Sequence, residues 1–384
     1  MRTREERGGR HALLVACALT LAAVMWPGVA VHGWTPARPG YVWSFPQDHW
    51  ARDGYKTEWW YFTGHLHTAG EPARRLGYQF TFFRIGVSPD APPPGSAWAA
   101  NDIIMGHAAL TDLKTGRHRF SELVVRAAPL LGGFGRYPEP RLAWSVGPPG
   151  TPDEWQLRWN GSGFDFTMAD AGQSFGFSLS TRPLKPLVFQ GPGGLSRKGE
   201  GATEASHYYS FTRMATTGTV RLDGEEWEVS GTSWMDKEFG SNQLGEDMQG
   251  WDWFSLQLDD GREVMLYLLR NRDGGTRYAG ATLVDSAGTV RYLDPGEWRL
   301  IATEEWTSPK TDAAYPARWK LQIPAAGIGA VITPKLADQE NTSALIPNLY
   351  YWEGSVRIES AKGKRLGQGY VELTGYGDDS RPPI

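Results

Sequence analysis

Apolar and polar side chains alternate at every second position in many short segments of this 384-residue chain. Because successive side chains of a β-strand point to opposite faces, this alternation predicts half-buried strands. Turn-forming groups such as Asp223-Gly224 separate the segments, and no helical stripe stands out after residue 30. Many short strands with regular turns are typical of a sandwich or a barrel, so we expect an all-β fold. The clearest candidate strands are residues 57–66, 76–84, 103–113, 208–214, 227–232, 253–258 and 264–269.

Two aromatic hairpins, at residues 60–84 and 251–270, resemble each other and divide the chain into two parts. Each hairpin could open one barrel, and the alternative is a chance similarity of two apolar hairpins. A Gly-rich segment at residues 190–205 precedes the place where the second part would begin. We therefore predict two tandem antiparallel β-barrels, the N-terminal one over residues 41–216 and the C-terminal one over residues 217–376.

The first 30 residues have the features of a signal peptide. Four arginines precede an apolar run at residues 12–26, and small residues follow it. The run is short for a membrane span, so we expect residues 1–30 to be removed and the protein to be exported to the bacterial periplasm or beyond. An uncleaved N-terminal anchor is the alternative. Cys17, the only cysteine, lies in this run, and we interpret it as an ordinary apolar position rather than a lipidation site.

The composition argues against several classes of function. The formal net charge is −4 and no basic stretch follows the signal segment, so we expect no nucleic-acid partner. The chain has no Gly-x-Ser-x-Gly elbow, no P-loop and no dinucleotide-binding fingerprint, which disfavours a serine hydrolase of that type and a nucleotide enzyme. The 18 Trp, 15 Tyr and 15 Phe residues suit wide cavities and β-rich cores, so we expect an apolar small-molecule ligand.

Glu58 lies in an aromatic strand and shares a face with Trp60 and Phe62. A carboxylate among aromatic rings is either paired with a donor or has a raised pKa. We favour a buried ion pair with Arg84 or Arg213, because unpaired buried charges are rare.

His65 and His67 lie two apart on one predicted strand face, a spacing that can fit a metal ion. No third ligand stands at a readable spacing, and the chain after Cys17 has no cysteine. We therefore expect exposed or packed histidines and no metal site.

Polar and aromatic residues gather again between residues 207 and 255. His207 and Tyr209 share one strand face, while Trp234, Asp236 and Glu238 share another. These groups suit general acid–base work in an apolar pocket, and they equally suit satisfied polar groups in a barrel wall. Aromatic residues near the junction suggest a site between the two halves. The residues expected to contact the ligand are Glu58, Trp60, Glu238, Trp251 and Trp253.

Four long motifs make the chain similar to the AttH/CrtC family, whose bacterial members are often described as carotenoid 1,2-hydratase, lipocalin-like or secreted hydrolase. They are FPQDHWARDGYKTEWWYFTGHL, HYYSFTRMATTGTVRLDG, VSGTSWMDKEFGSNQLGEDMQGWDWFSLQLDDGREVMLYLLR and YYWEGSVRIE. The resemblance spans roughly residues 41–376 and looks closer to the AttH branch than to the photosynthetic carotenoid hydratases. It implies two calycin-type, lipocalin-like barrels in tandem, with apolar ligands as the common theme.

The resemblance also implies a chemistry, the cofactor-free addition of water to a tertiary carbon–carbon double bond. In the hydratases, a His and a Trp two residues apart precede a Tyr and an Asp, also two apart. By that pattern, His207 matches the His and Asp236 matches the acid. Tyr209 stands where the Trp would be, and Trp234 stands where the Tyr would be. The implied catalytic set is therefore Asp236 as the acid, His207 as its partner, Trp234 and Tyr209.

Two functions follow as expectations. One is a hydratase-like lyase, or a cyclase, because the family includes relatives that fold polyene substrates. The other is a non-catalytic periplasmic carrier of an isoprenoid, lipid or polyene, because AttH-branch proteins are similar to ones encoded beside ABC-type export machinery, which implies export components as partners. The secreted-hydrolase description has no nucleophile in this sequence to support it.

Overall fold

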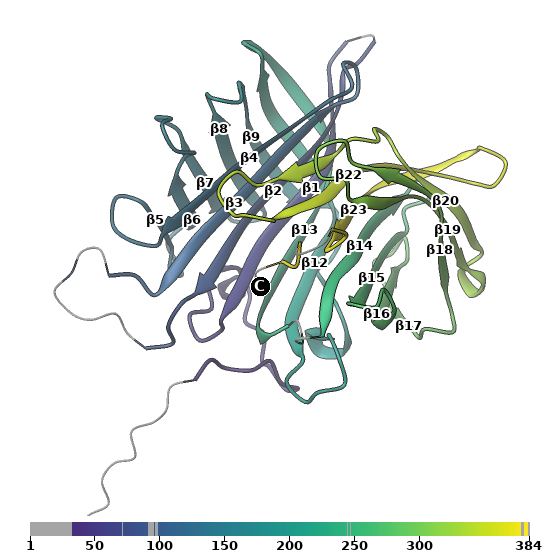
Figure 1. Ribbon diagram of the computed structural model, residues 1–384, viewed down its shortest axis with the longest axis horizontal. Helices are drawn as coiled ribbons and strands as arrows, with labels where there is room; N and C mark the ends of the chain where they lie inside the picture. Colours follow the sequence, from purple (N-terminus) through teal and green to yellow (C-terminus); the bar gives the residue numbers. More distant parts are fainter. Residues whose placement is uncertain are drawn as a thin grey trace, which may run out of the picture. The chain divides into compact units, whose positions relative to one another are not determined.

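The computed structural model describes residues 33–70, 72–90, 96, 99–243, 245, 247–377 and 380–382. The predicted signal peptide, residues 1–30 with Cys17, lies outside the described residues. Two large antiparallel sheets contain nearly all the regular structure (Figure 1). The short helices in the described part are 3₁₀ turns, and no helix there is long and apolar enough to cross a membrane. The predicted all-β class is confirmed.

The first sheet has 13 strands and curls into a nearly closed barrel, in the order β4-β3-β2-β1-β13-β12-β9-β8-β7-β6-β5, with β10 and β11 paired to β12. The curling brings together strands that are far apart in this order. For example, Trp60 in β1 stacks on Phe134 in β5. The 3₁₀ turns η1 (Gln47–His49) and η2 (Pro192–Gly194) lie in its connections. Its strands are β1 (Thr57–Thr68), β2 (Arg75–Gly86), β3 (Asp102–Asp112), β4 (Arg117–Arg126), β5 (Gly132–Phe134), β6 (Arg141–Val146), β7 (Glu154–Trp159), β8 (Phe164–Asp170), β9 (Phe175–Pro183), β10 (Val188–Phe189), β11 (Leu195–Arg197), β12 (Ala205–Leu222) and β13 (Glu225–Asn242).

The second sheet has 10 strands and forms a half-barrel, in the order β17-β16-β15-β14-β23-β22-β20-β19-β18, with β21 paired to β22. The turn η3 (Pro324–Ala326) joins β19 to β20. The two aromatic hairpins of the sequence are β1–β2 and β14–β15, the first strands of the two sheets. The strands of the second sheet are β14 (Met248–Leu258), β15 (Glu263–Asn271), β16 (Thr276–Val284), β17 (Val290–Leu293), β18 (Arg299–Thr307), β19 (Ala314–Ile323), β20 (Ile328–Pro334), β21 (Glu340–Thr342), β22 (Tyr350–Glu359) and β23 (Arg365–Thr374).

The chain changes sheet later than the predicted barrel boundary between residues 216 and 217. That boundary falls inside β12, and the turn at Asp223-Gly224 joins β12 to β13 in one long hairpin. Strand β13 also pairs with β1 along twelve positions, from Thr57 opposite Gly240 to Thr68 opposite Val229. Both strands therefore belong to the first sheet, and the chain crosses to the second sheet between Asn242 and Met248.

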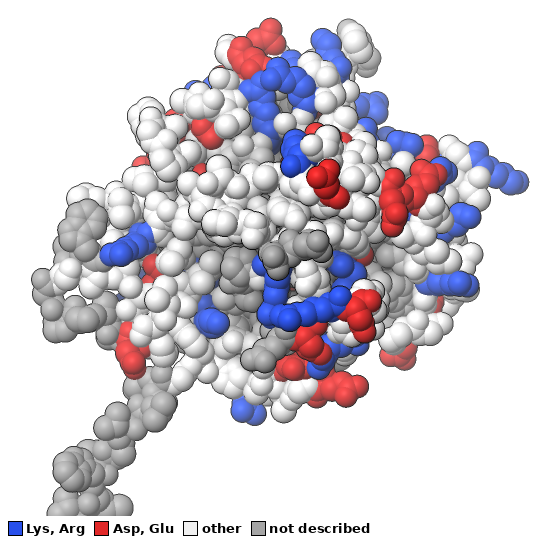
Figure 2. Space-filling model, in the orientation of Figure 1, with Lys and Arg blue, Asp and Glu red and all other residues white. Residues whose placement is uncertain are grey.

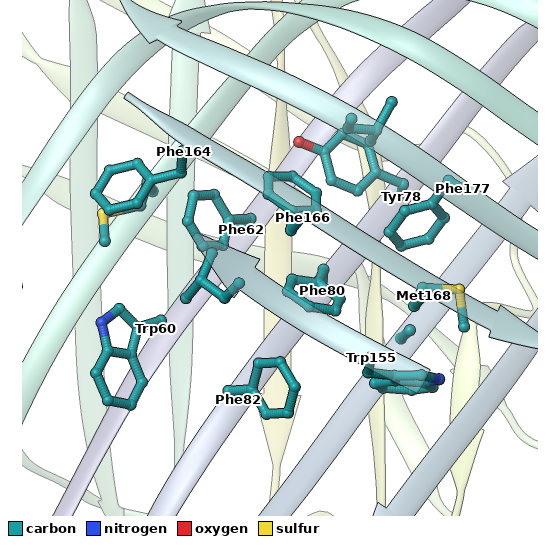
Figure 3. Close-up of a cluster of buried hydrophobic side chains, with 14 of the residues drawn as sticks. Trp60, Phe62, Tyr78, Phe80, Phe82, Trp155, Phe164, Phe166, Met168 and Phe177 are labelled. Carbon is teal, nitrogen blue, oxygen red and sulfur yellow. The ribbon is translucent and has the colours of Figure 1, made fainter. Parts of the chain in front are cut away.

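Aromatic side chains fill the interior of the first barrel (Figure 3). Phe80 stacks on Phe166 with ring centroids 4.9 Å apart, and Phe62 lies 4.6 Å from the same ring. Trp60 and Trp155 are also fully buried there. Rings packed at this density fill the middle of the barrel.

The outer face of the first sheet packs against the second sheet through buried polar contacts. The Nδ1 atom of His107 in β3 lies 2.7 Å from the hydroxyl of Tyr351 in β22, and Tyr61 in β1 donates to Glu353 at 2.5 Å. His65 lies 3.1 Å from the carbonyl oxygen of Gly369. The described parts of both sheets belong to one compact unit.

His107 predicts a loss of stability in acid. Burial lowers the pKa of His107 to about 3, so the folded protein holds it neutral, while the unfolded chain takes up a proton near pH 6.5. Its contribution is complete above about pH 6.5 and is lost as the pH falls toward about 3, amounting to about 2 kcal/mol between pH 7 and pH 5. Urea unfolding at both pH values should show that His107→Gln depends less on pH than the wild type by this amount. An unchanged pH dependence would contradict the assignment.

Candidate active site between the two sheets

A pocket lies between the outer face of the first sheet and the second sheet. Its cavity volume is about 80 Å³, and together with the open space at its mouth it spans about 700 Å³. The enclosed space is smaller than the roughly 300–1,000 Å³ of a typical small-molecule site, so the site is a narrow slot that opens to solvent. The residues around it are Trp59, Tyr61, Phe83, Lys198, Tyr208, Asp236, Glu238, Gln243, Trp251, Trp253, Tyr267, Leu269 and Glu372.

The alternation of β13 sets which groups face the slot. Asp236 and Glu238 point to the outer face, and Lys237 between them points into the barrel. In β1, Trp59 and Tyr61 face the slot, while Trp60 faces the barrel core. One face of β1 and β13 therefore lines the barrel core, and the opposite face lines the slot.

Asp236 is buried and receives three hydrogen bonds from neutral donors. Tyr208 donates to Oδ2 at 2.7 Å, while Ser210 and the Trp234 indole donate to Oδ1 at 2.5 and 2.7 Å. The Trp253 indole donates in turn to the Tyr208 hydroxyl at 3.1 Å. Burial raises the pKa of Asp236 to about 7 although the hydrogen bonds oppose the rise, so near neutral pH this group can give or take a proton.

Glu372 is a second carboxyl in the slot, contributed by β23. It accepts a hydrogen bond from the Trp251 indole at 3.0 Å, and burial raises the pKa of Glu372 to about 7. Glu353 stands directly opposite it on β22. Burial and the Glu372 charge raise the pKa of Glu353 well above its usual range, so Glu353 stays protonated. The slot therefore has two carboxyls that exchange protons near pH 7, Asp236 and Glu372.

Lys198 and Glu238 form an ion pair at the side of the slot. The ammonium lies 2.7 Å from Glu238 Oε1, which also accepts from Ser206 at 2.5 Å. The same ammonium lies over the rings of Tyr208 and Tyr267, at 5.3 and 4.9 Å from their centroids. The charge of Lys198 is thus matched within the site.

Tyr208→Phe tests the hydrogen bonding around Asp236. The change removes the hydroxyl that favours the charged carboxylate, so the pKa of Asp236 should rise above its present value of about 7. NMR titration of ¹³C-labelled aspartate should show this shift, with the exposed Tyr292→Phe as the matched control. An unmoved titration would show that the hydroxyl does not stabilise the carboxylate.

The structure brings five of the predicted site residues together at the slot. Asp236, Glu238, Trp251 and Trp253 line it, and Trp234 donates to Asp236 from the same strand face.

His207 and Tyr209 lie on the other face of β12, and this corrects the predicted partnership of His207 with Asp236. The residues of β12 opposite the acidic positions of β13 are Tyr208, paired with Glu238, and Ser210, paired with Asp236. Because neighbouring positions of a strand point to opposite faces, the odd-numbered His207 and Tyr209 turn away from the slot.

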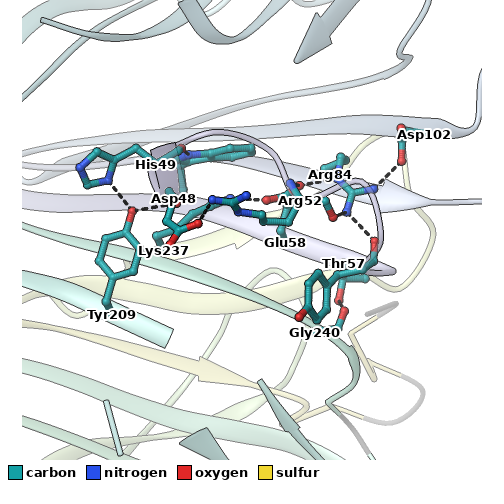
Figure 4. Close-up of polar contacts among 12 residues, drawn as sticks. Asp48, His49, Arg52, Thr57, Glu58, Arg84, Asp102, Tyr209, Lys237 and Gly240 are labelled. Carbon is teal, nitrogen blue, oxygen red and sulfur yellow. Dashed lines mark hydrogen bonds and ion pairs between the residues drawn. The ribbon is translucent and has the colours of Figure 1, made fainter. Parts of the chain in front are cut away.

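His207 and Tyr209 instead belong to an aromatic cluster at the barrel wall. The His207 ring lies 4.4 Å from Tyr41 and 5.2 Å from Phe239, and burial lowers the pKa of His207 to about 4. The Tyr209 hydroxyl lies 2.6 Å from His49 Nδ1 (Figure 4).

Glu58 and Trp60 are also separate from the slot, because they face the inside of the barrel. Glu58 pairs with Arg84 and with Lys237, so the favoured interpretation of a buried ion pair agrees with the contacts (Figure 4). Burial alone would raise the pKa of Glu58, but the two cations outweigh it and hold that pKa below its usual value. The Lys237 ammonium lies 3.3 Å from the Trp60 ring centroid. Arg213, the other candidate partner, pairs with Glu263.

The polar groups of the site that escaped the sequence analysis include Tyr208, Ser210, Glu353 and Glu372. The two glutamates carried a readable signal, since Tyr351 and Glu353 share a strand face, as do Tyr370 and Glu372. A carboxylate among aromatics is the same pattern that drew attention to Glu58. Tyr208 and Ser210 needed the register of β12 against β13, which sequence alternation does not give.

The two histidines with metal-like spacing lie in ordinary contacts. His65 bonds to Gly369, and His67 Nε2 lies 3.2 Å from the Ser230 hydroxyl. Among the residues that the structure describes, no three His, Cys, Asp or Glu side chains gather where a metal ion could bind. On the face seen in Figure 2, Lys and Arg lie beside Asp and Glu at the top, at the right and below the centre of the view, and much of the rest carries neither.

Comparison with known proteins connects this arrangement to a family. A family model described as AttH-like matches residues 36–376. The crystal structure of a Nitrosomonas europaea protein provisionally described as AttH is 32% identical, with a TM-score of 0.77, over 89% of this chain and 99% of that one. Kievitone hydratase from Nectria haematococca shares the fold at 13% identity, with a TM-score of 0.61, over 90% of this chain and 96% of that one. No curated protein sequence matches significantly.

Proposed function

Because the chain belongs to the AttH-like family, we propose that it is an exported, lipocalin-like protein whose slot binds an apolar isoprenoid, lipid or polyene and adds water to one of its double bonds. The observation that carries the proposal is Asp236, a buried acid with a pKa of about 7 beside aromatic rings. Kievitone hydratase, which shares the fold, is a hydratase by name.

The chemistry uses only groups of this chain and water. Asp236 donates its proton to the less substituted carbon of the double bond, which leaves a tertiary cation on the other carbon. The faces of Trp251 and Trp253 stabilise that cation. A water molecule then adds to the cation, and Glu372, whose pKa is about 7, accepts the proton that the water releases. Proton exchange with solvent returns both carboxyls to their starting states.

The second candidate is a non-catalytic carrier of a hydrophobic ligand that works with an ABC-type export system. The position of His207 favours it, because the histidine that the family resemblance pairs with the acid turns away from Asp236. In that case the raised pKa of Asp236 follows from burial and has no catalytic use.

Mass spectrometry separates these functions. The protein is purified from the cell envelope of its host, and the co-purifying apolar molecule is identified and returned to the ligand-free protein in H₂¹⁸O. A hydratase yields a product heavier by one H₂¹⁸O, whereas a carrier returns the ligand unchanged. If the wild type binds no apolar molecule, both functions are excluded, and recovery only from the cytoplasm excludes export.

A further inference from the structure

We propose that the slot selects its ligands by charge: it binds cations and neutral molecules that become cationic during reaction, and it rejects anions. The inference concerns the same site as the proposed function and names the class of ligand that the site takes. It rests on the location of that site but does not require that the protein be a catalyst.

The first argument is the pairing of the slot carboxyls. Asp236 receives hydrogen bonds only from hydroxyl and indole groups, and Glu372 from the Trp251 indole. No described Lys or Arg lies within ion-pair distance of either carboxylate. Both acids therefore lack a compensating charge, and a positive ligand would supply it.

The second argument is that the positive charge of Lys198, beside the slot, is already paired. Lys198 is the only described Lys or Arg that lines it, and Glu238 holds its ammonium at 2.7 Å. A carboxylate or phosphate head group would have to displace Glu238 and approach Asp236 and Glu372. Like charges in a partly desolvated site repel strongly, so anionic lipids and free fatty acids should bind poorly.

The third argument is the aromatic wall. Trp253 packs edge-on against Tyr61 with centroids 5.1 Å apart, and Trp59 lies 6.2 Å from Phe83. Trp251 completes this lining. Aromatic faces beside carboxylates are the arrangement that recognises quaternary ammonium groups, and the same faces stabilise a carbocation.

Charge selection predicts that the affinity for a cation depends on pH even when the cation itself does not titrate, because the slot carboxyls change charge. The groups that face Asp236 and Glu372 are Lys198 from the loop after β11, Tyr208 from β12, Glu238 from β13, Tyr61 from β1, Tyr267 from β15 and Glu353 from β22. Burial raises the pKa of each of the three tyrosines and of Glu353, so these four stay neutral near pH 7. The two slot carboxyls are the groups that change charge between pH 6 and pH 8.

Three molecules of similar shape test the inference on the full-length protein by calorimetry: phenyltrimethylammonium, its neutral isostere tert-butylbenzene, and the anion benzenesulfonate. We expect the cation to bind best and to bind about tenfold more tightly at pH 8 than at pH 6, with release of about one proton. The neutral compound should change less than about twofold, and the anion should bind least. Equal affinities for cation and isostere, or a pH-independent cation affinity, would overturn the inference.

Variants locate the effect. Asp236→Asn combined with Glu372→Gln should remove the preference for the cation and its pH dependence, while the exposed Glu304→Gln should keep both. Circular dichroism and thermal melting establish that the double variant is folded; if it is not, the single variants replace it, and each should lose part of the pH dependence. The preference can hold in a protein that hydrates nothing, and hydration can occur without the preference, so the two proposals fail separately.

Discussion

Glu58→Gln is expected to lower the free energy of unfolding by about 3–5 kcal/mol, because it leaves the buried Lys237 without a carboxylate and leaves Arg84 with Asp102 alone. Arg84 and Lys237 are almost fully buried, and both pair with Glu58 inside the first barrel. The amide keeps the shape of the side chain and can still accept from the Arg52 backbone N–H, so the loss comes from charge. Urea unfolding at pH 6 measures it.

The effect of Glu58→Gln should depend on pH. Burial lowers the pKa of Lys237 to about 7 despite the Glu58 charge. Below pH 7 the variant must bury a charged lysine or deprotonate it at a cost, whereas well above pH 7 the lysine is neutral in both proteins. The destabilisation should therefore be largest below pH 7 and shrink by pH 9. Glu304→Gln, which breaks an exposed pair with Arg318, should cost less than about 0.5 kcal/mol and serves as the control. An equally small loss for Glu58→Gln would show that the barrel interior does not need the ion cluster.

Asp236→Asn is expected to lower the rate of water addition by at least about 100-fold, because general acid catalysis contributes about 10²–10⁴-fold and the amide cannot give a proton. The amide keeps the size of the side chain, so the ligand should stay bound. In the wild type, the rate should fall as the pH rises above about 7, since the acid must be protonated. The ¹⁸O-incorporation assay with the co-purified ligand measures both effects.

Stability distinguishes a catalytic loss from a folding defect. The folded pKa of Asp236 is raised, so its contribution to stability is full below about pH 4 and is lost as the pH rises through about 7. The asparagine side chain of the Asp236→Asn variant cannot ionise, so this variant should be at least as stable as the wild type at pH 8. The exposed Asp294→Asn should change neither rate nor stability. Retained activity in a folded Asp236→Asn protein would remove Asp236 from the mechanism and favour the carrier.

The sequence predicted the class of fold because alternation and turns are local signals. It also placed Trp234, Asp236 and Glu238 on one face, since a strand's period fixes that relation without any knowledge of its neighbours. The pairing of His207 with Asp236 required a relation between two strands, and their register placed Ser210 opposite Asp236 instead. The pairing of β13 with β1 is a relation of the same kind. The sequence marks the turn at Asp223-Gly224, but the alternation on its two sides does not show that β13 returns to pair with β1.

Each of the strands β12 and β13 has one face in the barrel core and one face at the slot, so substitutions on the two faces have different consequences. A substitution at Met235 or Lys237 alters the packed barrel, whereas a substitution at Asp236 alters the slot. These three residues are consecutive in β13. The wall contributed by β14 and β15, with Trp251, Trp253, Tyr267 and Leu269, is not part of that barrel. Divergence of ligand preference among relatives should therefore concentrate on the second-sheet wall, where a new side chain can reshape the slot while the aromatic core of the first barrel stays as it is.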